Sequence, residues 1–229
     1  MTRVRRTKVV SAVVSLMLVG AACAARAPQS LQRSTYSAPT ALPAPQRVGG
    51  MSLDQALATR RSVRTFSARQ LSASQLGQLL WAGQGITSQD GKRTAPSAGG
   101  LYPIELYAVV GNGLWHYLPV GHRVEIRAAP NLHADLQKAA FGQQAAGQAP
   151  QVIAVAVAYD RTTAKYGARG RAYVDMEAGH VAQNILLQAA ALRLAAVPIG
   201  GIDQFRCATV LGLPPDETVA YLIPTGFPG

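Results

Sequence analysis

The stretch TAPSAGGLYPIELYAVV, residues 94–110, joins a loop of small residues directly to an apolar run. Ile, Leu, Tyr and Val dominate residues 104–110, and such residues are typical of a strand. Ser97, Ala98, Gly99 and Gly100 carry little or no side chain, so backbone amides can approach a flat ligand closely there. The stretch therefore predicts a strand whose entrance loop carries a binding site.

Further strands are expected on the C-terminal side of this one. The runs GLWHYL (113–118) and HRVEIRA (122–128) are separated by a short turn, PVGH, as in a hairpin. Residues 152–159, VIAVAVAY, are unbroken in their apolar character, which indicates a central strand covered on both faces. Short runs at 195–201 and 218–226 complete the set.

Helices are indicated by capping signals and by apolar residues at helical spacing. Ser52 with Gln55, and Ser72 with Gln75, have the spacing of capping boxes, which predicts helices over 52–60 and 72–86. Longer apolar periodicity predicts helices over 172–194 and 203–212. We expect an α+β fold in which helices cover a mostly antiparallel sheet.

The N-terminal segments differ in composition from this folded part. Residues 1–22 combine a basic start, MTRVRRTK, with a short apolar run, which is typical of a signal peptide. Residues 23–50 are rich in Ala, Pro, Ser and Gln and are expected to be a flexible tether before a domain at 51–229. The protein is therefore expected to be exported to the periplasm, or held at a membrane as a lipoprotein. Lipidation at Cys23 and simple cleavage nearby both stay open.

The basic character of the chain belongs largely to these segments. The formal net charge is +11, but seven of the 22 basic residues and none of the 11 acidic residues precede Met51. The domain therefore carries only +4, without a basic stripe interleaved with aromatic residues. This pattern argues against a nucleic-acid partner.

Several other site classes lack their signatures. The glycines match neither a P-loop nor a dinucleotide-binding pattern, the four histidines lack metal-ligand spacing, and no serine-hydrolase motif occurs. We expect His116 and His122 at the surface and Cys207 as a buried, unreactive thiol.

The run RRSVRTF, residues 60–66, is the strongest remaining candidate for a ligand site. Three arginines fall within five positions, after the end of an expected helix. Arginine suits phosphate because its planar fork makes bidentate, charge-assisted hydrogen bonds. By itself the run also fits a solvated helix end.

Three stretches taken together resemble a known family. RRSVRTF after a short first helix, PSAGGLYP entering a strand, and DMEAGHVAQNILLQAAALRLAAVPIGGID near the end resemble the nitroreductase-like FMN flavoproteins. The SagB-type dehydrogenase branch, which includes azoline oxidases of peptide biosynthesis, is the most similar. The resemblance covers Ser52 to about Gly226.

The resemblance implies FMN as cofactor and a homodimer with the flavin at the subunit interface. It implies that Arg60, Arg61, Ser62 and Arg64 hold the phosphate, the ribityl chain and the ring edge. It further implies two ring-lining sets: Ser97, Ala98, Gly99, Gly100 and Leu101, from across the subunit boundary, and Pro198, Ile199, Gly200 and Gly201, whose amides face the ring. The implied activity is hydride transfer through the flavin, with a nitro compound or quinone reduced by NAD(P)H, or with a substrate dehydrogenated.

Two departures from the family pattern keep an alternative open. Many relatives have asparagine at the position of Gly100, and many place a Lys or Arg near the C-terminus, where this chain ends TGFPG. The alternative is an exported, non-catalytic binding or interaction protein on a flavoprotein scaffold. No catalytic residue is assigned; the candidates for a catalytic base are Tyr102, Lys165, Tyr166 and His180.

Overall fold

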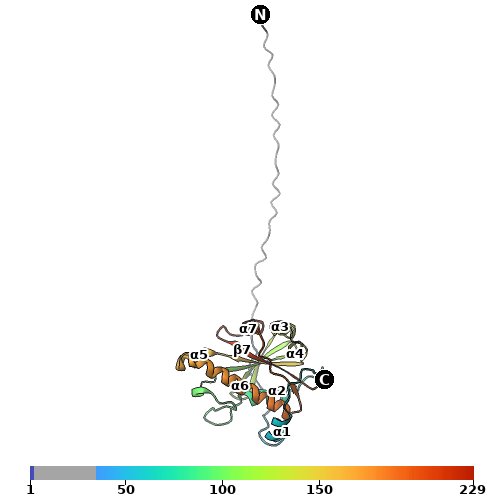
Figure 1. Cartoon of the computed structure of the whole chain (residues 1–229), viewed down its shortest axis with the longest axis vertical. Coiled ribbons are helices and arrows are strands. Elements are labelled where there is room, and N and C mark those ends of the chain that lie inside the picture. Colours follow the sequence, from blue (N-terminus) through green and yellow to red (C-terminus); the bar gives the residue numbers. More distant parts are fainter. Residues whose placement is uncertain (3–34) are drawn as a thin grey trace. The chain divides into compact units, whose positions relative to one another are not determined.

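A computed structural model describes residues 1–2 and 35–229, and residues 35–229 lie in one folded unit. At its centre is a sheet with the order β1-β4-β3-β2-β5-β7-β6, in which all neighbouring strands of the described part are antiparallel (Figure 1). The strands are β1 (Thr40–Ala41), β2 (Ile104–Val110), β3 (Gly113–Leu118), β4 (Arg123–Ala128), β5 (Gln151–Val157), β6 (Ala195–Ala196) and β7 (Thr218–Gly226).

Helices cover both faces of the sheet. The long helix α6 packs with α2 against one face, and α3, α4 and α7 pack against the other (Figure 1). The helices are α1 (Leu53–Thr59), α2 (Ala73–Gln84), α3 (Leu132–Ala139), α4 (Gln144–Gln148), α5 (Tyr159–Tyr166), α6 (Arg169–Ala191) and α7 (Gln204–Leu211), with a single 3-10 turn, η1 (Ala98–Gly100). The expected α+β architecture is confirmed.

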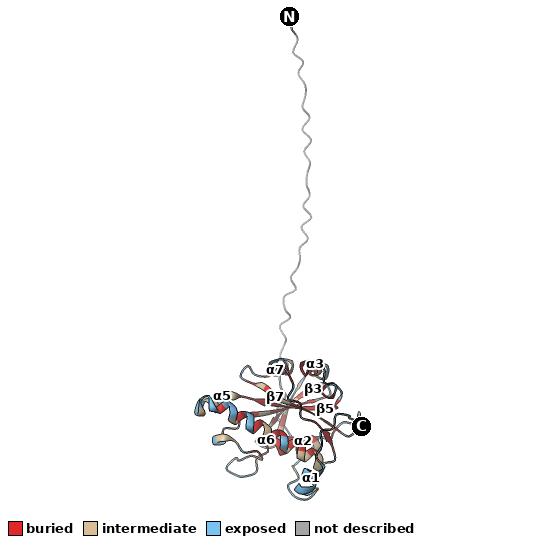
Figure 2. Cartoon of the chain, in the orientation of Figure 1, coloured by how far each residue is buried: buried red, intermediate tan, exposed pale blue. Residues whose placement is uncertain are grey.

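Strand β5 is the central element of the core. All seven of its residues are buried, and it lies between β2 and β7 (Figure 2). Alternate side chains of β5 enter the apolar clusters on opposite faces of the sheet, Ile153 towards α2 and α6, and Ala154 towards α3 and α7. The prediction of a central strand covered on both faces is therefore confirmed.

The helix signals read from the sequence are present where expected. Ser72 Oγ accepts a hydrogen bond from Gln75 N, and Ser72 N donates to Gln75 Oε1, which completes a capping box at α2. At α1, Ser52 Oγ accepts from Gln55 N, which is one half of such a box. The predicted apolar stripes of α2 and α6 face the core, because all of their residues are buried. These residues are Leu76, Leu79, Leu80, Gly83, Ala178, Val181, Ala182, Ile185, Leu186 and Ala189. The long helix begins at Arg169 and ends at Ala191, three residues earlier at each end than expected.

Part of the expected tether is attached to the sheet. Ser37 N donates to Ile126 O, β1 pairs with the edge strand β4, and Leu42 is only 9% exposed. Farther on, Gln46 and Gln78 exchange two hydrogen bonds, of 2.8 and 3.0 Å. We call residues 36–47 the strap. Its two-residue strand is too short to produce a periodic pattern, so composition alone indicated a flexible segment.

The other N-terminal predictions concern residues that lie outside the described part. They are the signal peptide at 1–22, a lipid anchor at Cys23, and the tether up to residue 34. Within the described part, no helix has both the length and the apolar character that crossing a membrane requires.

Candidate functional site

The arginine run leaves α1 in an extended conformation and lies at the end of the sheet where β6 pairs with the last residues of β7. Arg60 is the C-cap of α1, and Val63 N donates to Ala196 O of β6 at 3.1 Å. Phe66 pairs with Pro228, and Ser67 N donates to Phe227 O at 3.0 Å. These long-range contacts hold the run beside β6 and the chain's end.

The three arginines of this run are not equivalent. Arg61 folds back on α1, because its guanidinium donates to the carbonyls of Ala58 and Arg60. Arg60 is half-buried and Arg64 exposed, and neither side chain makes an ion pair or hydrogen bond to any described residue. Ser62 is exposed between them. Two cationic groups are thus available for an anion from outside the chain.

The stretch Pro198–Gly201 lies at the same end of the sheet. Ile199 and Leu222 of β7 exchange two backbone hydrogen bonds, so the amide of Ile199 is already used. Gly200 and Gly201 are exposed, and their amides make no hydrogen bond within the described residues. Gln143 donates to Gly201 O at 2.9 Å and fixes this loop to the segment before α4. Two neighbouring amide donors are therefore available here.

The loop Ser97–Tyr102 has an unusual backbone. Gly99, Gly100 and Tyr102 have φ angles of 67°, 66° and 48°, all in the left-handed region. Glycine accepts this region readily, whereas for tyrosine it carries a cost of about 1–3 kcal/mol. A Cβ on Gly99 would lie 2.8 Å from Tyr166 Oη and 3.0 Å from Lys165 Nζ, but one on Gly100 would meet open space. Gly100 therefore offers a bare backbone edge to a ligand.

The first stretch bonds to β6, after which the third stretch begins, and the second stretch lies elsewhere. Ser97 lies beside Glu177, in the N-terminal half of α6. Val63 instead bonds to Ala196, which follows the C-terminal end of α6. Glu177 and Ala191 are 14 residues apart on this helix, so the two regions are separated by about 20 Å along its axis. In Figure 1, α1 and α5 mark the two ends of α6.

The four candidates for a catalytic base have different surroundings. The Tyr102 side chain makes two contacts with Arg93. Its hydroxyl accepts a hydrogen bond from Arg93 N at 3.2 Å, and the centre of its ring lies 4.4 Å from the Arg93 guanidinium carbon. Lys165 and Tyr166, at the end of α5, both lie over Gly99. His180 is exposed on α6. Lys165 and Tyr166 thus adjoin the predicted ligand-lining residue Gly99 through their side chains, whereas Tyr102 adjoins Ser97 through its backbone amide.

Sequence reasoning missed the buried acid beneath this loop. Glu177 is 2% exposed, and burial raises the pKa of its carboxyl to about 7, against the opposing effects of Ser97 and Arg93. The only sequence signal is its position: Glu177 precedes Ala178 in the buried stripe of α6, so helical spacing placed it close to the core face.

The surface position expected for His116 is wrong. Its side chain is 17% exposed and lies between Glu105 and Glu125, at 3.2 and 2.9 Å, with its ring stacked on Tyr107. Burial lowers the pKa of His116, but its bonds to the two carboxylates outweigh burial and raise it. Cross-strand pairing across β2, β3 and β4 creates this cluster, which local sequence cannot reveal.

The buried position expected for Cys207 is confirmed. Its side chain is fully buried, and burial raises the pKa of its thiol to about 11. The sulfur therefore stays protonated and unreactive at neutral pH.

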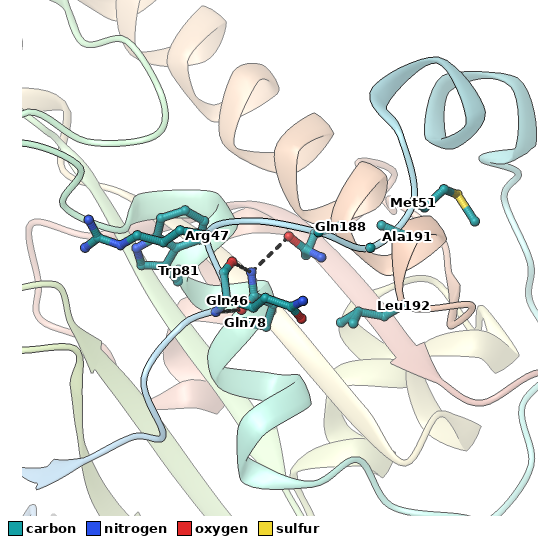
Figure 3. Close-up of a pocket in the computed structure, with 10 residues that line it drawn as sticks. Gln46, Arg47, Met51, Gln78, Trp81, Gln188, Ala191 and Leu192 are labelled. Carbon is teal, nitrogen blue, oxygen red and sulfur yellow. Dashed lines mark hydrogen bonds between the residues drawn. The ribbon is translucent and has the colours of Figure 1, made fainter.

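A cavity of about 200 Å³ lies between the strap, α2 and the end of α6 (Figure 3). Gln78 donates to both Gln46 O and Gln188 Oε1, and the Arg47 guanidinium lies 5.9 Å from the Trp81 ring. None of the residues expected to bind FMN lines this cavity. It is distinct from the predicted cofactor site.

Comparison with protein families matches residues 57–227 to the nitroreductase family. A provisionally named nitroreductase of Methanocaldococcus jannaschii is 37% identical over 180 residues, which cover 76% of this chain and 90% of that protein. The family match, over residues 57–227, includes the arginine run and both glycine-containing stretches.

Solved structures share the fold. A provisionally named nitroreductase of Ralstonia eutropha is 30% identical, with a TM-score of 0.76 over 83% of this chain and 90% of the other. The NADPH:FMN oxidoreductase of Vibrio harveyi, solved with NAD⁺, is 21% identical, with a TM-score of 0.58 over 77% of this chain and 68% of the other. At that identity the second likeness concerns the fold alone.

Proposed function

Because the chain belongs to the nitroreductase family, we propose that it is an FMN-dependent oxidoreductase that passes a hydride through the flavin to or from a small organic substrate. Flavin, when bound, supplies reversible hydride transfer, so the protein's part is to bind, orient and shield it. FMN combines a phosphate with a flat ring, and the described residues offer partners for both.

The residues present fit this cofactor. Arg60 and Arg64 have unpaired guanidinium groups, which would hold the phosphate. The free amides of Gly200 and Gly201 would face the ring edge and stabilise negative charge that develops there. Ile199 would contribute contact rather than a hydrogen bond, since its amide donates to Leu222 O. Ser62 and Arg61 would lie beside the phosphate, with Arg61 keeping its helix end in place.

The observation that carries the proposal is the division of the site. One chain has its phosphate-binding arginines and the Gly200–Gly201 amides at one end of α6, and the loop Ser97–Leu101 at the other. Two chains related by a twofold axis would place the loop of one against the arginines of the other. We therefore propose a homodimer with two interfacial FMN sites.

We propose that a small organic substrate reaches the open surface beside Gly100, near the two side chains that lie over Gly99. An approaching nitro compound, quinone or SagB-type dehydrogenation substrate would meet Lys165 and Tyr166, which can hold or move a proton. NAD(P)H is the proposed donor for the reductase reaction, in line with the cofactors named for the Vibrio harveyi relative. A quinone is the proposed acceptor for the dehydrogenase reaction.

The absorption spectrum of the purified protein tests this proposal. We expect a yellow dimer with one FMN per chain, which is reduced anaerobically and reoxidised by a quinone, a nitroarene or oxygen. Protein that stays colourless after titration with FMN would refute the proposal. Flavin that binds and never reoxidises with these acceptors would favour the non-catalytic binding protein instead.

We also propose export, to the periplasm or to a membrane surface through Cys23, on the basis of the signal-like residues 1–22. Fractionation of cells that express the wild-type chain and Cys23→Ser tests this. Release by Cys23→Ser of a membrane-bound protein would support lipidation, and equal release of both would support simple cleavage. If both the wild-type protein and Cys23→Ser stay in the cytoplasm, export is contradicted.

A further inference from the structure

The loop that lines the proposed flavin site lies directly above a buried acid. Glu177, on α6, is 2% exposed, and Ser97 lies beside its carboxyl, whose pKa burial raises and Ser97 lowers. A carboxyl group is rarely buried unless a specific partner compensates for its lost hydration. Ser97 is the first residue of the loop, so the acid acts where the loop begins.

Ser97 also contacts the strained part of the loop. Its Oγ accepts a hydrogen bond of 2.9 Å from Tyr102 N, and Tyr102 is the tyrosine with a φ of 48°. A serine hydroxyl can accept that bond while its own hydrogen points to a carboxylate. Strained conformations persist only where the surroundings hold them. The chain Glu177–Ser97–Tyr102 therefore clamps both ends of the loop.

Hydrogen bonds replace only part of the hydration that the Glu177 carboxyl loses on burial. Gln84 Oε1 accepts a bond of 2.8 Å from Arg93 Nη1, but Gln84 Nε2 and Glu177 Oε1 are both buried and have no hydrogen-bond partner of good geometry. Arg93 is the only charged side chain among the described residues that acts on this carboxyl, and it does so past Gln84. The ionised acid is thus poorly balanced.

We propose that Glu177 is the positioning residue of the proposed flavin-binding loop: through Ser97 it holds residues 97–102 in the conformation, left-handed at Gly99, Gly100 and Tyr102, that exposes the Gly100 edge. This role rests on the proposed function in so far as the loop binds FMN. The clamp itself is a property of the chain alone.

Ionisation of Glu177 should favour opening of the loop: the contact with Ser97 favours the ionised carboxyl, but the cost of burying the charge outweighs it. Burial raises the pKa of Glu177 to about 7, so the carboxyl is largely neutral at pH 6 and largely ionised at pH 8. A buried carboxylate facing only Ser97, Gln84 and the distant charge of Arg93 gains hydration if the loop opens. A hydrated carboxyl in the open loop would have the ordinary pKa of 4.5, so we expect the order of the loop to fall as pH rises from about 4.5 to about 7 and to stay constant above that range.

Hydrogen exchange of the Tyr102 amide in the full chain, without FMN, is the direct test. We expect Glu177→Ala to exchange this amide about tenfold faster than the wild type, as for the loss of one net hydrogen bond. Glu177→Gln keeps a polar contact to Ser97 and cannot ionise, so its exchange, corrected for the intrinsic rate, should not change between pH 5 and 7. The wild type should lose protection over that range. Asp175→Asn, which removes an exposed carboxylate from the same helix, is the matched control and should resemble the wild type.

Amides of β5 serve as the internal reference for folding, since an unfolded variant would lose their protection too. Unchanged exchange at Tyr102 in Glu177→Ala would overturn the proposal, as would the same pH dependence in Glu177→Gln and the wild type. A parallel FMN titration separates the two proposals. Wild type that binds no FMN refutes the cofactor and leaves the clamp to be judged by exchange. Wild type that binds FMN should do so about tenfold more tightly than Glu177→Ala.

Discussion

Neighbouring residues of the same type have different surroundings in this protein. Arg61 donates to carbonyls of its own helix end, whereas Arg60 and Arg64 have no partner in the described chain. The amide of Ile199 is used by Leu222, whereas those of Gly200 and Gly201 are free. The ligand-binding capacity of each stretch therefore belongs to particular residues within it.

Removing the two unpaired guanidinium groups should release the cofactor. We expect Arg60→Ala with Arg64→Ala to weaken FMN binding at least about 100-fold, because each phosphate contact of this kind contributes about 1.5–3 kcal/mol. The melting temperature should stay near that of the wild type, since neither side chain packs in the core.

Flavin fluorescence titration and thermal unfolding give the two measurements. Arg123→Ala with Lys138→Ala removes the same charge from β4 and α3 and serves as the control. If the arginine double variant purifies with stoichiometric FMN, the phosphate site has been assigned to the wrong residues.

The buried acid also predicts how stability depends on pH. The pKa of Glu177 is raised from 4.5 to about 7 on folding, so the folded state binds the proton more tightly than the unfolded state. The free energy of unfolding therefore falls as pH rises from about 4.5 to about 7, and this contribution is constant above that range.

Glu177→Gln should lack this contribution. Between pH 5 and 8 the melting temperature of the wild type should fall relative to that of Glu177→Gln, in thermal unfolding followed by circular dichroism. Because other groups, among them His116 and Glu217, titrate equally in both proteins, the difference isolates Glu177. Parallel curves for the two proteins would contradict the assignment.

Among the elements, the strap shows where composition misleads. Residues 23–50 have the composition of a flexible tether, yet residues 36–47 pair with β4, bury Leu42 and exchange two hydrogen bonds with Gln78. The strap covers the edge of the sheet next to β4, which would otherwise offer unpaired backbone groups to other chains. It then leads directly into α1 and the arginine run.

Two substitutions, one within the strap and one directly after it, separate an attached segment from a flexible one. Leu42→Ala should lower the free energy of unfolding by about 2 kcal/mol, the lower end of the range for buried leucines, because Leu42 lies at the edge of the core. Val48→Ala, at an 82% exposed position, should change it by less than about 0.5 kcal/mol. Urea denaturation measures both, and equal, negligible effects would show that the segment is not attached in solution.

The longer elements could be predicted because their signals are local. The stripes of α2 and α6 repeat at helical spacing, Ser72 and Gln75 mark a helix start, and β5 is apolar throughout. The short helices α3, α4 and α5 were missed. α4 has five residues, and α5 has only one buried residue, so neither shows a clear apolar period.

For the whole molecule, the proposed division of the site between the two ends of α6 predicts that FMN binding requires a dimer. A chain with defective arginines and a chain with a defective loop should then complement each other. In a mixed dimer, one site would combine the two intact halves and the other site the two defective halves.

Mixing the Arg60→Ala/Arg64→Ala chain with a Gly100→Trp chain, after unfolding and refolding together, tests this arrangement. Gly100→Trp fills the open space beside the loop. Random pairing should restore about a quarter of the wild-type FMN capacity, because about half of the dimers are mixed and each has one intact site of two. No recovery, with both chains folded, would mean that each site is built within one chain.

The sequence by itself determined the α+β class, the main helices and strands, the family resemblance and the three stretches that are candidates for binding FMN. These features depend on residue type and on spacing within a few turns or strands. Only the tertiary structure decided which amides and guanidinium groups are free, that the strap is attached, and that Glu177 lies beneath Ser97. Those outcomes depend on pairs of residues far apart in the chain, such as Gln46 with Gln78 and Val63 with Ala196, whose contacts arise when packed elements bring them together.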